Sequence, residues 1–233
     1  MQNERVMIKQ EARDYLNKNY GYNFKLFLIT ILTYVLLSVA TDEPSGWVAF
    51  ALVLITIVNF FVTISTSYVS LDGLRAEAPT GNPITQQTES LKSKYVWGVI
   101  VISLLMSIYT TLWTLLLIVP GIVKSYSYSQ ALNIYKDSVD AGQPLGYNEA
   151  ITKSRELMDG HKADLFIMHL SFILWGLLVI VTFGIALFYV YPYFTLAGQN
   201  FYKHLVPGRL GLYDLPETVR DAVLQENDED ELS

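Results

Sequence analysis

Apolar residues in this chain come in uninterrupted blocks, much longer than the apolar faces of soluble helices or strands. Four stretches hold no Asp, Glu, Lys or Arg: residues 26–41, 44–71, 95–123 and 165–202. Because a helix rises about 1.5 Å per residue and the hydrocarbon core of a bilayer is about 30 Å thick, roughly 20 residues cross it once. The first two stretches are therefore predicted to be single spans, joined by a tight turn at 42–46.

The two longer stretches have room for two crossings each. In the last stretch the turn is predicted near residues 182–184. The third stretch continues past Lys124 to Tyr135, and its turn is predicted either at Pro120-Gly121 or near residues 109–111, in which case one long helix is kinked at Pro120. We therefore predict an all-α fold, a polytopic membrane protein with six transmembrane helices in three hairpins. The membrane domain covers residues 24–205, with spans at about 24–41, 47–70, 97–119, 121–136, 165–182 and 184–202.

The remaining segments are short and polar. Residues 1–23 predict a cytoplasmic N-terminal helix that ends near Gly21, and residues 72–94 predict a flexible loop. Residues 147–159 carry apolar positions at helical spacing, which predicts an amphipathic helix on the inner membrane face. Residues 206–233 form an acidic cytoplasmic tail that we predict to be disordered.

The basic residues support this topology independently. If the N-terminus is cytoplasmic, fifteen of the sixteen Lys and Arg residues fall on the cytoplasmic side, and Lys124 is the exception. This is the distribution described by the positive-inside rule. No cleavage site of small residues follows the first apolar run, so we expect a retained anchor. The predicted localisation is the plasma membrane, multi-pass, with both termini cytoplasmic.

Composition narrows the function classes further. The chain is 52% hydrophobic and 16% charged, with a mean hydropathy of +0.31, whereas soluble domains are about a quarter charged. It has no cysteine, which excludes disulfides, thiolate metal sites and cysteine nucleophiles. The net charge of −6 is concentrated in residues 214–233, which hold eight acidic residues and one arginine. The rest of the chain is nearly neutral, so we expect no binding to nucleic acid.

An internal similarity connects the last two hairpins. Residues 112–136 and 174–203 match in the same direction, which favours a parallel repeat over chance similarity of apolar helices. The most informative matches are Trp113 with Trp175, Gly121 with Gly184, Tyr126 with Tyr189, Tyr128 with Tyr191 and Tyr135 with Tyr202, and Asn133 also matches Asn200.

Lys124 is the basic residue within an otherwise apolar hairpin. With Ser127 and Tyr128 it forms a polar stripe on one helix face. Ionisable groups inside a membrane are costly, so this stripe is a candidate site for an anionic headgroup or carboxylate. The alternative is that Lys124 extends its ammonium group to the interface while the hydroxyl groups bond between helices.

Other polar residues support weaker hypotheses. Arg155 and Lys162 are candidate contacts for anionic lipid headgroups. His161, Asp164 and His169 could be drawn as a metal site, but the spacing of the histidines does not suit a compact pair of ligands. We therefore expect no metal and no cofactor. Catalytic motifs are also absent from the sequence, so we expect no catalytic residues.

Several motifs occur together in one known family. They are Ile118-Val119-Pro120-Gly121-Ile122-Val123-Lys124-Ser125-Tyr126-Ser127-Tyr128, Ser154-Arg155-x-x-Met158-x-Gly160-x-Lys162, Ser171-Phe172-x-x-Trp175, Pro192-Tyr193, Phe201-Tyr202 and Ala12-Arg13-x-x-Leu16-x-x-Asn19-Tyr20-Gly21. From residue 9 to about 205 the chain resembles an uncharacterised family of bacterial integral membrane proteins, domain of unknown function number nine hundred and seventy-five. The resemblance implies a multi-pass protein of the bacterial plasma membrane. It implies no activity.

The function expected from the sequence is that of a non-enzymatic membrane protein, acting through membrane lipids, a membrane protein partner or a homo-oligomer. A small transporter or export component for an anionic or peptide substrate is the alternative, suggested by the repeat, Pro120-Gly121 and Lys124. A membrane enzyme acting on lipids is a second alternative, suggested by Lys124, His161 and His169.

Overall fold

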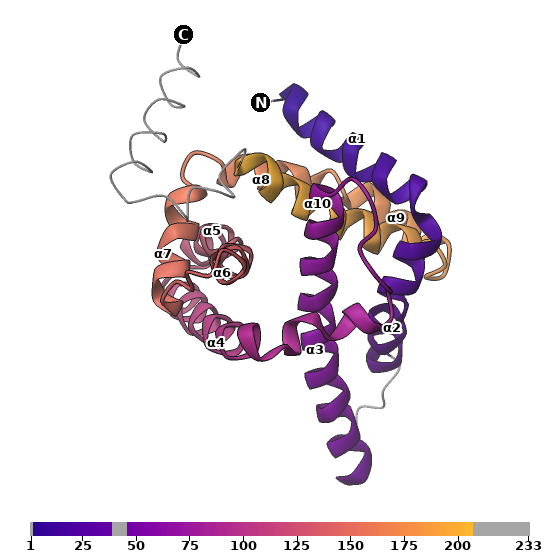
Figure 1. Ribbon diagram of the computed structural model, residues 1–233, viewed down its shortest axis with the longest axis horizontal. Helices are drawn as coiled ribbons and strands as arrows, with labels where there is room; N and C mark the ends of the chain where they lie inside the picture. Colours follow the sequence, from indigo (N-terminus) through magenta and orange to yellow (C-terminus); the bar gives the residue numbers. More distant parts are fainter. Residues whose placement is uncertain (1, 39–45, 207–233) are drawn as a thin grey trace. The chain divides into compact units, whose positions relative to one another are not determined.

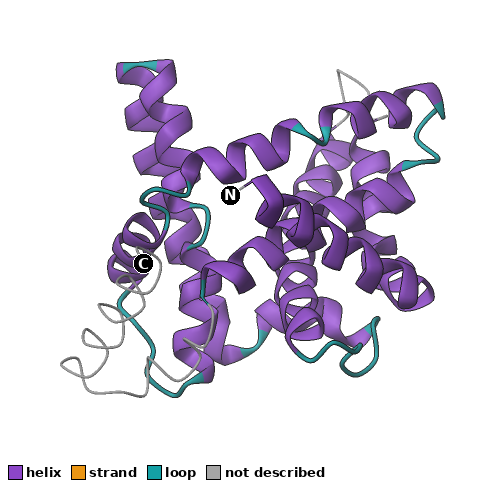
Figure 2. Ribbon diagram, turned by 90° about the horizontal axis from the view of Figure 1, so that it is seen from above, coloured by secondary structure: helices purple, strands orange, loops and turns teal. Residues whose placement is uncertain are grey.

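The computed structural model describes residues 2–38 and 46–206 and is helical through most of them (Figures 1 and 2). Strands do not occur in these two ranges, so the predicted all-α class is confirmed for them. The turn at 42–46 and the acidic tail after Val206 lie largely outside the described residues. The helices are α1 Gln2–Lys18, α2 Tyr20–Ser38, α3 Gly46–Arg75, the 3-10 helix η1 Thr85–Leu91, α4 Ser93–Leu116, α5 Ile118–Tyr128, α6 Ala131–Asp140, α7 Tyr147–Leu157, α8 Lys162–Leu170, α9 Ile173–Val181 and α10 Leu187–Leu205.

Four helical segments are long and apolar enough to cross a membrane. They are Tyr20–Leu37, Gly46–Arg75, Ser93–Leu116 and Lys162–Val181, where the last combines α8 and α9. Each coincides with one of the six predicted spans. The other two predicted spans fall on α5 with α6 and on α10.

The chain divides into two compact units. The first unit comprises residues Met1–Val99 and Asp159–His204, and the second comprises Ile100–Met158 and the chain from Leu205 onward. The helix α4 therefore begins in the first unit and continues into the second. Each unit has its own buried core.

In the first unit, α1 packs along α10. Ile8, Ala12, Tyr15 and Leu16 lie on one face of α1 and are buried. Tyr189 at the start of α10 donates to Asn17 Oδ1 at 3.0 Å, which places the end of one helix beside the beginning of the other. The helix α1 ends at Lys18, three residues before the predicted end near Gly21, and Gly21 lies in the first turn of α2. The Asn19 side chain between the two helices donates to the Tyr15 carbonyl at 3.1 Å.

The core of the first unit combines α2, α3 and α10. Leu26, Phe27 and Ile31 of α2 are buried with Val69 of α3, and aromatic residues from the start of α10 pack against them. Phe27 and Tyr191 contact edge to face with ring centroids 5.7 Å apart. Such pairs stabilise beyond the area that they bury.

The prediction of a flexible loop at 72–94 is wrong for its second half. This half forms η1 and continues to α4, and its Gln87 and Ser90 side chains are buried. Gln87 donates to the carbonyls of Lys25 and Leu26, both at 3.0 Å. Ser90 Oγ lies 2.8 Å from Ser65 Oγ of α3. These bonds attach η1 to α2 and α3, because buried polar groups require partners.

In the second unit, α4 and α5 form a hairpin that reverses at Leu117. Leu117 is extended, with φ −159° and ψ 136°. Neither predicted turn is at this position: residues 109–111 lie inside α4, and Pro120-Gly121 lies in the first turn of α5. Proline is tolerated in a first turn because the N–H that it lacks has no intrahelical partner there. The hairpin is antiparallel, since Gly121 faces Thr114 and Tyr128 faces Tyr109.

The predicted span 121–136 is divided into α5 and α6 by a break after Tyr128. The predicted amphipathic helix at 147–159 is confirmed as α7. Its buried residues Ala150 and Ile151 pack with Tyr128 and Tyr135, so its apolar face covers α5 and α6. The apolar residues of α7 are therefore covered by protein, and its position on the inner membrane face stays a prediction.

In the last hairpin, the turn predicted near 182–184 is confirmed. Gly184 has φ +87° and Phe183 φ +50°, and Thr182 Oγ1 accepts from the amide of Ala186 at 3.0 Å. The helix before the turn is interrupted between α8 and α9. Gly121, the position matched to Gly184 in the repeat, is helical. The two segments of the repeat thus differ in local structure at this point.

Candidate functional site

The polar stripe of Lys124, Ser127 and Tyr128 does not converge on one point. The Lys124 Nζ atom lies 4.9 Å from the ring centroid of Trp113. Ser127 Oγ donates to the Val123 carbonyl at 2.9 Å. Tyr128 is buried in the core of the second unit. The ammonium group and the hydroxyl groups therefore face different surroundings, and the ammonium group lies over an aromatic ring.

Sequence reasoning missed the cluster around the break between α5 and α6. Ser154 Oγ of α7 donates to the Ser127 carbonyl at 2.8 Å and accepts from the Gln130 amide at 3.1 Å. Both backbone groups would otherwise lack helical partners. Gln130 Oε1 in turn accepts from Asn133 Nδ2 at 3.1 Å. The helical spacing of Ser154 with Ala150 and Ile151 is the signal that could have shown that its hydroxyl is buried.

Arg155 and Lys162, the candidate headgroup contacts, belong to different units. Arg155 is exposed on α7. Lys162 Nζ, at the start of α8, pairs with Asp159 at 2.8 Å. The hydrogen bond and the charge of Lys162 hold the pKa of Asp159 below its ordinary value. Part of the Lys162 charge is therefore already compensated, and Arg155 is the more available cation for a lipid headgroup.

Two of the three residues considered for a metal site, Asp164 and His169, have other contacts. Asp164 accepts from Arg5 of α1 at 2.7 Å. The His169 ring lies 4.9 Å from the Phe194 ring, centroid to centroid. Among the residues placed by the structure, no group of three His, Cys, Asp or Glu side chains could hold a metal ion.

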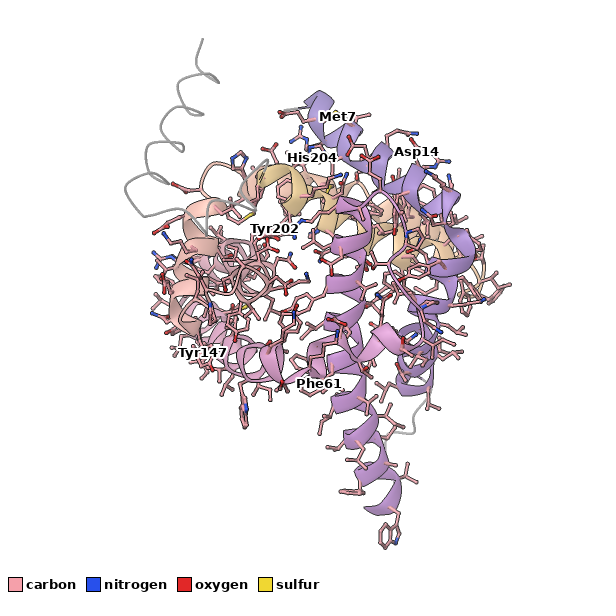
Figure 3. All side chains as sticks on the ribbon, viewed as in Figure 1. Met7, Asp14, Phe61, Tyr147, Tyr202 and His204 are labelled. Atoms are coloured by element: carbon pink, nitrogen blue, oxygen red, sulfur yellow. The ribbon has the colours of Figure 1, made fainter. Side chains whose placement is uncertain are left out.

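A second cluster missed from the sequence connects α1 to α10. Glu11 Oε2 accepts from Asn200 Nδ2 at 2.9 Å and lies 2.7 Å from His204 Nε2 (His204 is labelled in Figure 3). Burial raises the pKa of Glu11, but the hydrogen bonds from Asn200 and His204 and the charges of His204 and Lys203 outweigh it. The pKa therefore lies below its ordinary value of 4.5. No local pattern marked this cluster, because its members are nearly two hundred residues apart.

The surface of the helices is unusually apolar. The buried residues of α3 begin at Val62, and Trp47 near its start is 86% exposed. Below the labelled Phe61, side chains project from α3 on all sides (Figure 3). Leu115 beside the α4–α5 turn is 80% exposed, and Phe183 in the last turn is 97% exposed. Soluble monomers rarely expose large contiguous apolar patches.

The fold therefore defines an all-α protein with several helices of a length and composition suited to a membrane. The chain from residue 115 to 207 matches the family model described as Protein of unknown function (DUF975). The resemblance expected from the sequence is thus confirmed for this segment, which runs from the end of α4 to just beyond α10. The N-terminal motif Ala12–Gly21 lies outside it. No curated protein and no solved structure matches the chain.

Proposed function

We propose that this chain is a multi-pass integral membrane protein without enzymatic activity, which acts through contacts with lipids or with a protein partner. The observation that carries the proposal is the exposed N-terminal half of α3. Residues 46–60 hold no charged side chain, and Trp47, Val53 and Ile57 are among its exposed residues. With 30 residues, α3 is about 45 Å long, more than the roughly 30 Å hydrocarbon core of a bilayer.

The proposed location is the bacterial plasma membrane, with both termini and the segment 136–162 in the cytoplasm. The distribution of Lys and Arg supports this orientation, since nearly all of them fall on that side. The lengths of the apolar runs favour helical hairpins, each of which returns the chain to the side from which it entered. The antiparallel contacts of α4 with α5, and of α9 with α10, are consistent with hairpins.

Lipid headgroups are the partners that the basic residues of the loops suit best. Arg155 would contribute about 1 kcal/mol to binding of an anionic membrane surface, and Lys162 would contribute less because it pairs with Asp159. A homo-oligomer or another membrane protein would cover part of the exposed apolar surface. The proposal includes no cofactor, no metal and no nucleic acid.

Cysteine labelling tests the orientation, because the chain has no native cysteine. A membrane-impermeant maleimide added to intact cells should label Ser45→Cys, in the predicted outer turn. It should not label Gln143→Cys, an exposed position in the predicted cytoplasmic segment, until the membrane is opened. Ser90 and Ser138 also lie in segments predicted to be cytoplasmic, but both are buried, so a cysteine at either position would be protected on any side of the membrane. Labelling of Gln143→Cys in intact cells would show that the orientation is wrong.

Solute flux into proteoliposomes separates this proposal from a transporter. Flux that depends on the protein would favour transport, and its absence together with lipid binding would favour the proposal. A lipid-modifying enzyme would change the lipid composition of the same vesicles, and this change would be lost in a double His161→Ala, His169→Ala variant.

A further inference from the structure

In the second unit, a charged helix packs close to the apolar tip of a hairpin. Tyr109 of α4 donates to Asn148 Oδ1 of α7 at 3.1 Å, and Ser154 of α7 bonds to the Ser127 carbonyl of α5. The helix α7 therefore lies beside the α4–α5 hairpin at the level of Tyr109 and Ser127. Its outward face is charged: Glu149, Arg155 and Glu156 are exposed.

The distance from this level to the turn is short. Leu117 lies eight residues beyond Tyr109, or about 12 Å along a helix, and ten residues before Ser127, or about 15 Å. The hydrocarbon core is about 30 Å thick. If the turn at Leu117 reached the far surface, α7 would lie near the centre of the core. Its charged side chains would then be in the most costly position that a membrane offers.

The opposite side of α4 holds no charged residue and is mostly apolar, although Ser107 and Thr111 are also exposed there. Ile102 and Tyr109 face the core of the unit, whereas Ile100, Leu104 and Ile108 are exposed. At 100° per residue Ile100 and Leu104 point away from Ile102 and Tyr109, and Ile108 lies at the side of the helix next to them. The unit therefore has two dissimilar sides, with an apolar stripe on α4 and the charged face of α7 opposite. This is the arrangement of a structure that lies in one interface of a bilayer.

The tip itself has no polar residue suited to a turn in water. Leu115, Leu116, Leu117, Ile118 and Val119 are 62–80% exposed and are followed directly by Pro120. Turns in water are typically rich in Gly, Pro, Asn, Asp and Ser, and the Pro120-Gly121 pair here lies within α5 and does not form the reversal itself. Lys124 is the first charged residue after the turn, seven residues beyond it, and its ammonium group lies over Trp113. Tryptophan and lysine are both typical of the interface between headgroups and acyl chains.

From these observations we infer that the α4–α5 hairpin does not cross the membrane. It enters one leaflet from the cytoplasmic side, turns at Leu117 among the acyl chains, and returns to the same side. The partner that covers residues 112–123 is thus the acyl-chain layer of the cytoplasmic leaflet. This inference rests on the proposed membrane location and replaces two of the six crossings predicted from the sequence.

The basic residues fit this topology better than they fit a full crossing. A hairpin returns its ends to the same side whether it crosses or not, so the positive-inside pattern does not distinguish the two. Lys124 does, because it would lie about 10 Å below the outer surface in a full crossing, whereas it lies close to the cytoplasmic interface in a half-crossing. All sixteen Lys and Arg residues then lie on one side.

Depth-dependent fluorescence quenching tests the inference. Val119→Cys and Ser125→Cys are separately labelled with bimane in vesicles that contain lipids brominated near the chain ends or near the headgroup. Both positions are exposed, so the label disturbs little packing. In a half-crossing, position 119 is quenched more by the deep bromines and position 125 by the shallow ones. In a full crossing this order reverses, because position 119 lies near the far surface and position 125 about 9 Å deeper in the core.

A reversed order overturns the inference. The inference is also overturned if bimane at position 119 is quenched by iodide in water and by neither brominated lipid. Failure of the proposed membrane location gives a different result, since the protein would then not float with the vesicles. As a control, bimane at Gln143→Cys should be quenched by iodide and by neither lipid.

Discussion

Gly121 of α5 lies so close to α4 that a Cβ atom built on it would be 2.8 Å from the Cα atom of Thr114 and would also meet the Thr114 hydroxyl. Such separations are shorter than real Cβ contacts allow. The reversal at Leu117 therefore depends on a residue without a side chain, three residues into α5. Glycine here serves close helix packing, and its backbone is helical.

Gly121→Ala should destabilise the hairpin by about 1–3 kcal/mol, because the methyl group forces the two helices apart. Thermal unfolding in detergent measures the change. Thr114→Ala in the same chain should restore part of the loss by removing the hydroxyl. Gly176→Ala is the matched control, since no atom lies within 4 Å of its Cβ position in α9. It should stabilise by about 0.5–1 kcal/mol, and equal stability of Gly121→Ala and the parent chain would contradict the packing argument.

Ser154→Ala should cost about 1–3 kcal/mol, because it leaves the Ser127 carbonyl and the Gln130 amide buried without the partner that they have now. Hydrogen exchange at the Gln130 amide should accelerate in the variant. Thr152→Ala is the control on the same helix, because the Thr152 hydroxyl donates to the Asn148 carbonyl within α7. A change beyond about 0.5 kcal/mol there would be unexpected.

Glu11→Gln should weaken the docking of α1 on α10 by about 1 kcal/mol, a modest value because the Glu11 side chain is 42% exposed. The pKa of Glu11 is depressed in the folded chain, so its contribution is fully present above the ordinary value of 4.5 and is lost as the pH falls through the lower folded pKa. The difference in melting temperature between the parent chain and the variant should thus shrink in acid, as Glu11 of the parent chain becomes protonated. Asp14→Asn, at an exposed carboxylate of α1, should show a smaller difference at neutral pH.

Lys124→Met should change stability by less than about 1 kcal/mol, the range of a cation–π contact at a partly exposed site. A double-mutant cycle with Trp113→Leu should give a coupling energy of about 0.5–1 kcal/mol between the two residues. A clear gain in stability on Lys124→Met would instead indicate a desolvated charge, as expected of an anion-binding site.

The sequence by itself determined the features that depend on local pattern. Runs without charged residues located the apolar helices, and the turn near Gly184 followed from run length. The helical spacing of Ala150, Ile151 and Ser154 predicted α7. These features could be predicted because each arises from neighbouring residues and from the preference of uncharged helices for an apolar environment.

Tertiary structure decided where the chain reverses and what covers each polar face. Three consecutive leucines give no turn signal, so the reversal at Leu117 comes from the fit of Gly121 against Thr114. The docking of α1 depends on contacts such as that between Asn17 and Tyr189, which are 172 residues apart. The bond between Tyr109 and Asn148 likewise sets the level of α7 beside the α4–α5 hairpin. This level limits how deeply the tip of the hairpin can enter a membrane. Contacts between distant residues leave no trace in the periodicity of a single sequence, because periodicity records only which face of a helix is buried and never which partner buries it.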